Sequence, residues 1–477
     1  MPPNAAHHLR PAAGGCDVAL LSMVPDTPEE STMTTGNKKK LRKLSRADEL
    51  LLERVQRATF EWFLEFRDRK TGMTQDRTRP GAATIAGVGF ALTCAAIGIE
   101  RKWISRSEGV EYTLSVLRTL ASAPQGDATQ GCAGYHGYFY HFLEPDTGLR
   151  ATSPKFWNSE LSSIDTALLM AGVVFVREYY RGRNAEEMEI RQLATKLYES
   201  VEWNFLLQDD KLICMGWNPE SGRIPAAYKG YCEAPILYLL ALGSPKYAVP
   251  ADSWKAFTST YTLGQVGEQQ FITMPGNPLF CYQYPHCWID FRGIGDEFTT
   301  AHGFDYFENS RRATLSHYAY ATSNPGKFRA YGNRDWGLTA CDGPGDVKKV
   351  IDNREVTFRG YSERGCPNGF DDGTIAPTAA ISSLPFAPRV VMSTLRGWLK
   401  SRPELFNRFG FADSFNPTFD DSTSSGWIDS DRLAIDQGPI VIMLENYRSG
   451  FVWDVMRRSK YLRRGLKRAG FSGGWLK

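Results

Sequence analysis

The sequence lacks the short motifs of metal, serine and nucleotide chemistry. It has seven histidines, two of them near the N-terminus, and no HExxH pair. A GxSxG elbow, a GxxxxGK[ST] phosphate loop and a GxGxxG turn are all missing. The stretch most similar to the GxSxG elbow, GYSERG, has the wrong spacing. His136 and His141 flank a predicted strand on opposite faces, so we expect structural hydrogen bonds from them rather than a metal site. We therefore expect any catalysis to depend on aspartate and glutamate side chains, without a metal or a cofactor.

Paired cysteines and long apolar runs are also missing. The nine cysteines include no CxxC and their number is odd, so we expect mostly reduced, buried thiols, with Cys281 and Cys287 the one pair close enough for a local bridge. No apolar run reaches the length of a membrane span. DVALLSMV is too short for a signal peptide and is followed by acidic residues and proline. As the chain is written we expect a cytoplasmic location; a periplasmic or secreted protein would follow from a different start, for which Met33 is the candidate.

Neither sign of charge dominates the folded body. The chain has 56 basic and 53 acidic residues. The basic excess lies at the two ends, in residues 1–44 and 454–477, which leaves residues 45–453 mildly acidic. Because a nucleic-acid enzyme needs a basic working face, we expect no nucleic-acid partner. The terminal RRSKYLRRGLKR is interpreted as a solvated helix end, with an anionic surface as the alternative.

Helical patterns fill the body of the chain. Ser45 caps a helix that extends to about Asp68, and further helices are predicted at 83–98, 106–122, 160–181, 185–206, 233–242, 252–260, 304–321, 376–381, 388–400 and 437–457. Residues 135–151 alternate around a Pro-Asp-Thr-Gly turn, which predicts a β-hairpin. Eleven to twelve helices without a linker are the content of six helical hairpins closed into a ring. We therefore predict an all-α (α/α)6 barrel over residues 45–460, between a disordered basic segment, 1–44, and a basic tail, 461–477.

Several acidic residues lie in surroundings too apolar for ordinary surface charges. Glu160 and Asp165 precede the apolar face of SSIDTALLMAG, where a helix-start role is the alternative to chemistry. Glu233 stands directly before the apolar run APILYLLALG. Partial desolvation there should raise its pKa, as a general acid requires. Asp436 precedes a Gly-Pro helix start, and Glu445, inside the same helix, is interpreted as a buried ion-pair partner.

Aromatic residues are abundant, at 13% of the chain. Core packing explains most of them, but aromatic faces also stack on sugar rings. Eight segments, taken in chain order, resemble the glycoamylase-like domain family: TGMTQDR, ATIAGVGFALTCAAIGIE, SELSSIDTALLMAG, GYCEAPILYLLALGSP, GFDYFENSRRAT, WGLTACDGP, GTIAPTAAISSLPFAP and IDQGPIVIMLENYRSG. The resemblance runs from about residue 50 to residue 457. The family is similar to glycoside hydrolase family 144, whose characterised members are endo-acting β-1,2-glucanases on an (α/α)6 barrel.

The resemblance implies a glycoside hydrolase with an oligo- or polysaccharide substrate, most of all β-1,2-glucan. It places the catalytic acid on Glu233, and Glu160 and Asp165 at the centre of the cleft. Asp436 is the candidate for activating water in an inverting, endo-acting reaction. Inverting enzymes keep the two carboxyl groups roughly 6.5–9.5 Å apart and retaining ones about 5–5.5 Å.

Sugar contacts are expected from loop side chains. The aromatic candidates are Trp157, Trp217, Tyr228, Tyr231, Trp288 and Trp336, and the arginine candidates are Arg77 and Arg311, each with a structural ion pair as the alternative. A transglycosylase or a polysaccharide lyase uses similar groups on the same barrel. A saccharide-binding protein without catalysis would lack a central carboxylate, whereas all the candidates are present here.

Overall fold

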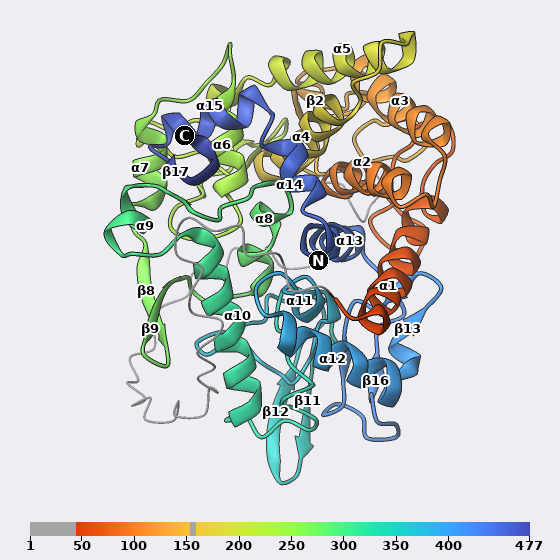
Figure 1. Ribbon diagram of the computed structural model, residues 1–477, viewed down its shortest axis with the longest axis vertical. Coiled ribbons are helices and arrows are strands. Elements are labelled where there is room, and N and C mark those ends of the chain that lie inside the picture. Colours follow the sequence, from red (N-terminus) through yellow and green to blue (C-terminus); the bar gives the residue numbers. More distant parts are fainter. Residues whose placement is uncertain (1–43, 153–158) are drawn as a thin grey trace.

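The inner layer of the protein consists of six helices buried on almost every side. The structure, a computed structural model, describes residues 44–152 and 159–477 and is helix-rich (Figure 1). The inner helices are α2 (Ile85–Glu100), α4 (Ser163–Tyr179), α6 (Pro235–Gly243), α8 (Tyr284–Trp288), α11 (Pro377–Ile381) and α13 (Ala434–Arg448). Helix α2 packs against α4, α4 against α6, α6 against α8, α8 against α13, and α13 against both α11 and α2. A helix that is apolar around its whole circumference has to be enclosed in this way.

Outer helices cover this layer with one apolar face each. They are α1 (Arg46–Glu65), α3 (Arg106–Ser122), α5 (Ala185–Ser200), α12 (Pro388–Ser401) and α15 (Lys460–Arg468). In the same order they pack on α13, α2, α4, α11 and α6. The remaining helices are α7 (Asp252–Thr258), α9 (Glu297–Ala301), α10 (Tyr306–Ser323) and α14 (Phe451–Met456).

Two glycines allow α2 and α4 to pack closely. A Cβ atom on Gly89 would lie 2.3 Å from the carbonyl oxygen of Leu168, and one on Gly172 would lie 2.1 Å from the carbonyl oxygen of Gly89. Each contact is with backbone, which cannot move aside as a flexible side chain can. The backbones of these two inner helices therefore meet directly, and any larger residue would force them apart.

The strands are short and lie in the connections between helices. They are β1 (Ala83–Thr84), β2 (Gly134–Tyr135), β3 (Tyr138–Phe139), β4 (Phe142–Leu143), β5 (Leu161–Ser162), β6 (Gly216–Asn218), β7 (Gly222–Arg223), β8 (Thr262–Val266), β9 (Gln269–Thr273), β10 (Ile294–Gly295), β11 (Val347–Ile351), β12 (Arg354–Phe358), β13 (Phe406–Asn407), β14 (Gly410–Phe411), β15 (Phe415–Asn416), β16 (Trp427–Ile428) and β17 (Ser472–Gly473). The predicted hairpin at 135–151 is only partly correct, because β2 pairs with β3 whereas β4 pairs with β1.

Two further predictions need correction. The helix predicted at 437–457 is two helices, α13 and α14, since Gly450 takes a left-handed conformation with φ of 74°. Residues 461–477 are not a tail: Tyr461, Leu462 and Leu466 of α15 are buried, and β17 pairs with β10.

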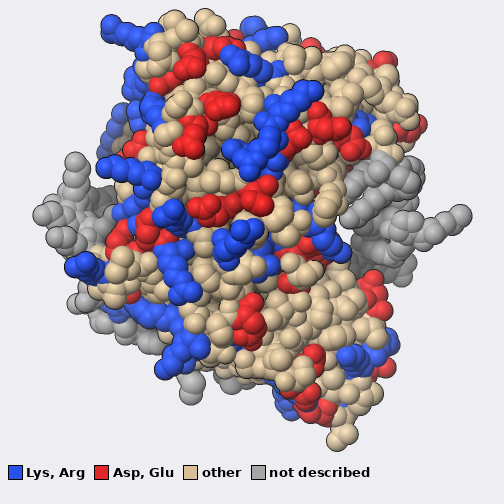
Figure 2. All heavy atoms as spheres, turned by 90° about the vertical axis from the view of Figure 1, so that its right-hand side faces the viewer, with Lys and Arg blue, Asp and Glu red and all other residues tan. Residues whose placement is uncertain are grey.

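The cysteine and surface patterns can be stated for the described residues. Cys281 and Cys287 are both free and buried, so they form no local bridge. None of the helices in the described part of the chain is long and apolar enough to cross a membrane. On the face shown in Figure 2, basic and acidic side chains are interspersed.

Candidate functional site

The N-terminal ends of the inner helices come together and carry acidic side chains. Asp165 lies in the first turn of α4, Asp436 in the first turn of α13, and Glu233 two residues before α6. The Tyr284 hydroxyl, at the start of α8, donates to the carbonyl of Ile435 at 2.8 Å. Since helix N-termini carry partial positive charge, they are suited to hold carboxylates.

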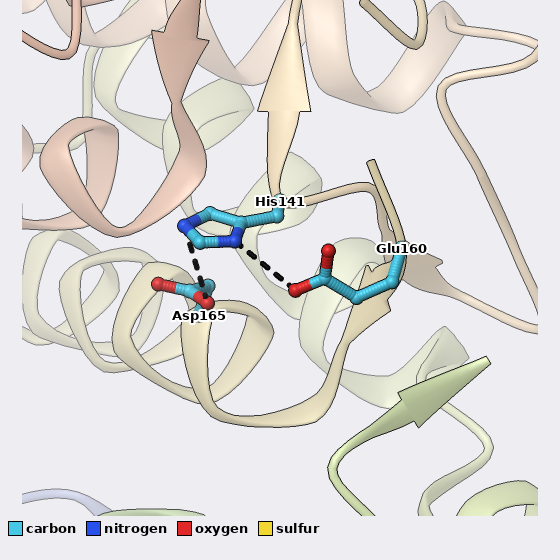
Figure 3. A group of neighbouring side chains, drawn as sticks. All are labelled: His141, Glu160 and Asp165. Atoms are coloured by element: carbon cyan, nitrogen blue, oxygen red, sulfur yellow. Dashed lines mark hydrogen bonds and ion pairs between the residues drawn. The ribbon is translucent and has the colours of Figure 1, made fainter. Parts of the chain in front are cut away.

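His141 lies between Asp165 and a further acid, Glu160 (Figure 3). Its Nδ1 is 3.1 Å from Glu160 Oε1 and its Nε2 is 3.7 Å from Asp165 Oδ2. Burial tends to lower the pKa of His141, but the charges of Asp165 and Glu160 raise it to about 9. Burial tends to raise the pKa of Glu160, and the hydrogen bond and charge of His141 lower it below its usual value. At neutral pH the group is an imidazolium between two carboxylates, a partnership that the sequence reasoning missed.

The surroundings of Glu233 favour its neutral, protonated form. Its carboxyl oxygen Oε2 accepts a weak hydrogen bond from the Cys281 thiol at 3.4 Å. Burial raises the pKa of Glu233 to about 7, and the negative charges of Asp165 and Glu363 add to the shift. The raised pKa agrees with the expectation from the apolar run that follows Glu233. A glutamic acid that is half protonated near neutral pH can donate a proton to a leaving group.

Asp436 lies in a second acidic region, together with Asp413. Burial raises the pKa of Asp436 above its usual value, while the hydrogen bond from Asp413 and the charge of Arg77 lower it. Burial raises the pKa of the Tyr284 phenol, and the charges of Asp436 and Glu233 raise it further. Tyr284 is therefore within electrostatic range of both acids.

Arg77 is held by acids around it. Its guanidinium donates to Asp76 Oδ2 at 2.9 Å, to Asp342 Oδ2 at 2.7 Å and to Asp431 Oδ2 at 3.4 Å. The ion-pair alternative for this arginine is thus realised, while its side chain keeps 19% exposure.

Two groups of donors are close enough to share a metal ion. They are His141, Glu160 and Asp165, and Asp342, Asp429 and Asp431. In the first, a histidine with a pKa of about 9 carries protons on both ring nitrogens at neutral pH and has no lone pair to offer. In the second, the Arg77 guanidinium already contacts Asp342 and Asp431. In both groups, acids are therefore already paired with a side chain of the protein: Glu160 and Asp165 with His141, and Asp342 and Asp431 with Arg77.

The loop 359–364 adds two residues that the sequence reasoning did not single out. Tyr361 is 60% exposed. Its phenol group is more enclosed than the rest of the side chain: burial and then the charges of Asp413 and Asp436 raise its pKa, so the phenol lies within electrostatic range of these acids. Burial also raises the pKa of Glu363, whose charge acts on Glu233. Both residues belong to the segment GYSERG, whose spacing does not fit a serine-nucleophile motif.

The predicted sugar-binding aromatics separate into several groups. The prediction for Trp288 and Trp336 is wrong: both are fully buried, with indole N–H groups bonded to Thr93 and Thr394. Tyr231 is also buried and packs on Tyr282.

The other predicted sugar contacts have different surroundings. Tyr228 is 8% exposed. Burial raises the pKa of its phenol, and the charges of Glu233 and Asp165 raise it further, so Tyr228 is within electrostatic range of both acids. Trp217, in β6, is half-buried, whereas Trp157 lies outside the described residues. Arg311 donates to Glu308 at 2.7 Å, which is the ion-pair alternative. Glu445 is confirmed as a buried ion-pair partner, since Arg101 Nε donates to it at 2.7 Å.

Comparison with known proteins identifies the family. A family model described as "Glycoamylase: Putative glucoamylase" matches residues 226–460. The crystal structure of a "putative glucoamylase" from Bacteroides uniformis is 30% identical, with a TM-score of 0.79, and the alignment covers 91% of this chain and 100% of that one. The chain belongs to the glycoamylase family.

Two further relatives of this glycoamylase-family protein have more specific descriptions. An endo-β-1,2-glucanase from Chitinophaga pinensis, in complex with sophorotriose and glucose, is 26% identical, with a TM-score of 0.76 and coverage of 91% of this chain and 100% of that one. A curated protein of Parabacteroides distasonis, an exo β-1,2-glucooligosaccharide sophorohydrolase acting at the non-reducing end, is 26% identical over 452 residues, 88% of this chain. This chain spans 58% of the length of that curated relative.

Tyr361 yields a prediction about substrate binding. Replacing Tyr361 by Ala removes an exposed aromatic face beside Asp436, and we expect kcat/KM to fall about tenfold, chiefly through KM. Tyr361→Phe keeps the ring and should keep the KM of the wild type. Equal KM values for all three proteins, measured on sugar oligomers, would exclude a stacking role.

Proposed function

We propose that this protein is a glycoside hydrolase that cleaves β-1,2-glucan with inversion, using Glu233 as general acid and Asp436 as general base. The observation that carries the proposal is the contrast between Glu233 and its neighbours. Glu233 has a pKa of about 7, whereas Glu160 is held ionised by His141. The opposite shifts in pKa give Glu233 and Glu160 separate roles, a proton donor and a fixed negative charge.

In this mechanism the neutral Glu233 protonates the glycosidic oxygen as the bond to the anomeric carbon breaks. Ionised Asp436 removes a proton from the water that attacks the opposite face of the sugar. Glu160, Asp165 and His141 form a fixed charged group beside Glu233 and hydrogen-bond sugar hydroxyls. Tyr228, Trp217 and Tyr361 supply ring faces, and Arg77 orients the carboxylates around Asp436.

The fold supports the same proposal. The circuit of contacts through α2, α4, α6, α8 and α13, with α11 packed on α13, favours an (α/α)6 barrel, in which α1, α3, α5, α12 and α15 belong to the outer ring. Residues 45–460 would then hold the catalytic centre. Residues 461–477 support its outer ring through α15.

Chain-end preference is a separate part of the proposal. We favour endo cleavage, in line with the name of the Chitinophaga pinensis structure. Release of sophorose from the non-reducing end is the second candidate, favoured by the name of the Parabacteroides distasonis relative.

The decisive experiment is incubation with linear β-1,2-glucan, beside β-1,3- and β-1,4-glucans as controls. We expect cleavage of the β-1,2-linked polymer alone, to oligomers of mixed length whose new reducing ends are first seen by NMR in the α form. Products first seen in the β form would overturn inversion, and sophorose as the sole early product would identify exo cleavage. Absence of any hydrolysis would overturn the proposed function.

A further inference from the structure

The carboxyl groups of Asp413 and Asp436 form a hydrogen-bonded pair below the surface of the site. Asp413 lies between β14 and β15 and is 1% exposed, and Asp436 is 4% exposed. A hydrogen bond between the two carboxyl groups contributes to the pKa of each of them. Two ionised carboxylates have acceptors only, so this bond requires one proton between them.

The surrounding hydrogen bonds leave room for that proton. Asp413 Oδ2 accepts the backbone N–H of Asp342 at 2.7 Å. Asp413 Oδ1 and Asp436 Oδ2 are both buried and have no donor among the described residues. A buried polar atom without a partner is costly, and one proton held between these two oxygens would give each of them a partner.

The charges around the pair determine where the proton resides. Asp413 faces Asp436 on α13, Asp342 in the loop before β11 and Asp429 after β16, all of them acidic. Asp436 faces Asp342 and Asp76 but also Arg77, and the phenols of Tyr361 and Tyr284 stand close to it. Because the cation acts on Asp436, the ionised form is better stabilised there, and Asp413 is the neutral member.

We propose that Asp413 is a positioning residue that carries the shared proton and donates it in a hydrogen bond to Asp436 Oδ2, holding Asp436 as an ionised and oriented base. The second oxygen of Asp436 is then directed at the attacking water. This inference relies on the proposed function only for the role of Asp436 as the base. The raised pKa of Asp413, caused first by burial and then by Asp436, is consistent with it.

Asparagine at position 413 is the closest mimic of a protonated aspartate. Its amide N–H can donate to Asp436 while its oxygen still accepts from the N–H of Asp342. We expect Asp413→Asn to keep kcat within about tenfold of the wild type, with an unchanged acid limb of the pH profile. Asp413→Leu has a similar shape and no donor, so its kcat should fall about 100-fold and its acid limb should move to higher pH. Asp436→Asn removes the base and should lose about 1,000-fold or more.

Two outcomes of these kinetics would overturn the proposal. If Asp413→Asn is as inactive as Asp436→Asn, Asp413 acts as a carboxylate and not as a proton carrier. If Asp413→Asn and Asp413→Leu behave alike, the hydrogen bond to Asp436 has no role.

Infrared spectroscopy of protein labelled with ¹³C-aspartate tests the proton without any substrate. At pH 8 we expect a protonated-carboxyl C=O band in the wild type that Asp413→Asn removes and Asp436→Asn keeps. A wild-type spectrum without such a band, or a band that survives Asp413→Asn unchanged, would show that the proton is not on Asp413. If no glucan is hydrolysed, the proposed function fails, yet this measurement still decides whether the pair shares a proton.

Discussion

Glu233→Gln should abolish hydrolysis while the protein still folds and binds sugar. A glutamine has the shape of the neutral carboxyl but no proton to give, so we expect kcat to fall about 1,000-fold or more, at the upper part of the usual range for general acids. KM and the affinity for oligosaccharides, measured by calorimetry, should change little. In the wild type, activity should fall as the pH rises through about 7, since Glu233 then loses the proton that the reaction needs.

Stability gives an independent check of the same residue. The folded-state pKa of Glu233 is raised, so its contribution to stability is fully present below its unfolded-state pKa and is lost as the pH rises through about 7. Glu233→Gln keeps the neutral form at every pH and should therefore be more stable than the wild type above pH 7, as followed by thermal unfolding.

Glu445→Gln is the matched control for Glu233→Gln. Glu445 is also a buried glutamate of the inner layer, at the other end of α13 from Asp436, where Arg101 and Gln56 bind it. Its replacement should lower the unfolding temperature and leave kcat nearly unchanged at temperatures where the protein is folded. A Glu233→Gln protein with full activity, or one that merely unfolds as Glu445→Gln does, would refute the assignment of the acid.

Arg364→Met should cause the largest loss of stability among single replacements near the site. Arg364 and Asp372 are both fully buried, and Arg364 donates to both carboxylate oxygens of Asp372 at 2.9 Å. The guanidinium also donates to the carbonyls of Cys341 and Arg359. Removal of one partner leaves a buried charge alone, which costs about 3–5 kcal/mol of unfolding free energy. Urea denaturation measures this loss.

The same replacement should also weaken substrate binding. Arg364 also donates to the carbonyls of Arg359 and Gly360 in the loop that carries Tyr361 and Glu363, so we expect KM to rise in Arg364→Met. The double variant Arg364→Met with Asp372→Leu removes the unpaired charge and should recover part of the stability. Arg118→Met, which breaks an exposed pair with Glu189, should have little effect. A loss for Arg364→Met no larger than for Arg118→Met would contradict this account.

The helices were largely predictable because their causes are local. Ser45 caps α1 by accepting the N–H of Asp48 at 3.1 Å, as expected from its position three residues earlier. The unbroken apolar run after Glu233 predicted a helix at 233–242 with a desolvated carboxyl at its start, and every residue of α6 is buried. The single helix predicted at 437–457 was wrong because a glycine in a left-handed conformation ends α13, a conformational choice that the apolar pattern does not record.

The aromatic contacts were less predictable, since composition does not say which face of a ring is covered. Trp288 and Trp336 were predicted to bind sugar, yet each fills the core and bonds a threonine. Tyr361 was not predicted to do so, yet its ring is exposed beside Asp413 and Asp436. The neighbouring residues in the sequence are typical of loops for the buried tryptophans and for the exposed tyrosine alike, so they do not distinguish the two.

The sequence by itself determined that the carboxyl group of Glu233 would be desolvated, because the apolar run that follows it directly in the chain forms the fully buried helix α6. Only the tertiary structure decided which groups share protons and charges. His141 meets Glu160 and Asp165, Arg77 meets Asp342, and Asp413 meets Asp436. Each of these partnerships depends on distances of a few ångströms between separate segments of the chain. Such distances are set by how the inner helices and their loops pack together, and no local pattern of residue types contains them.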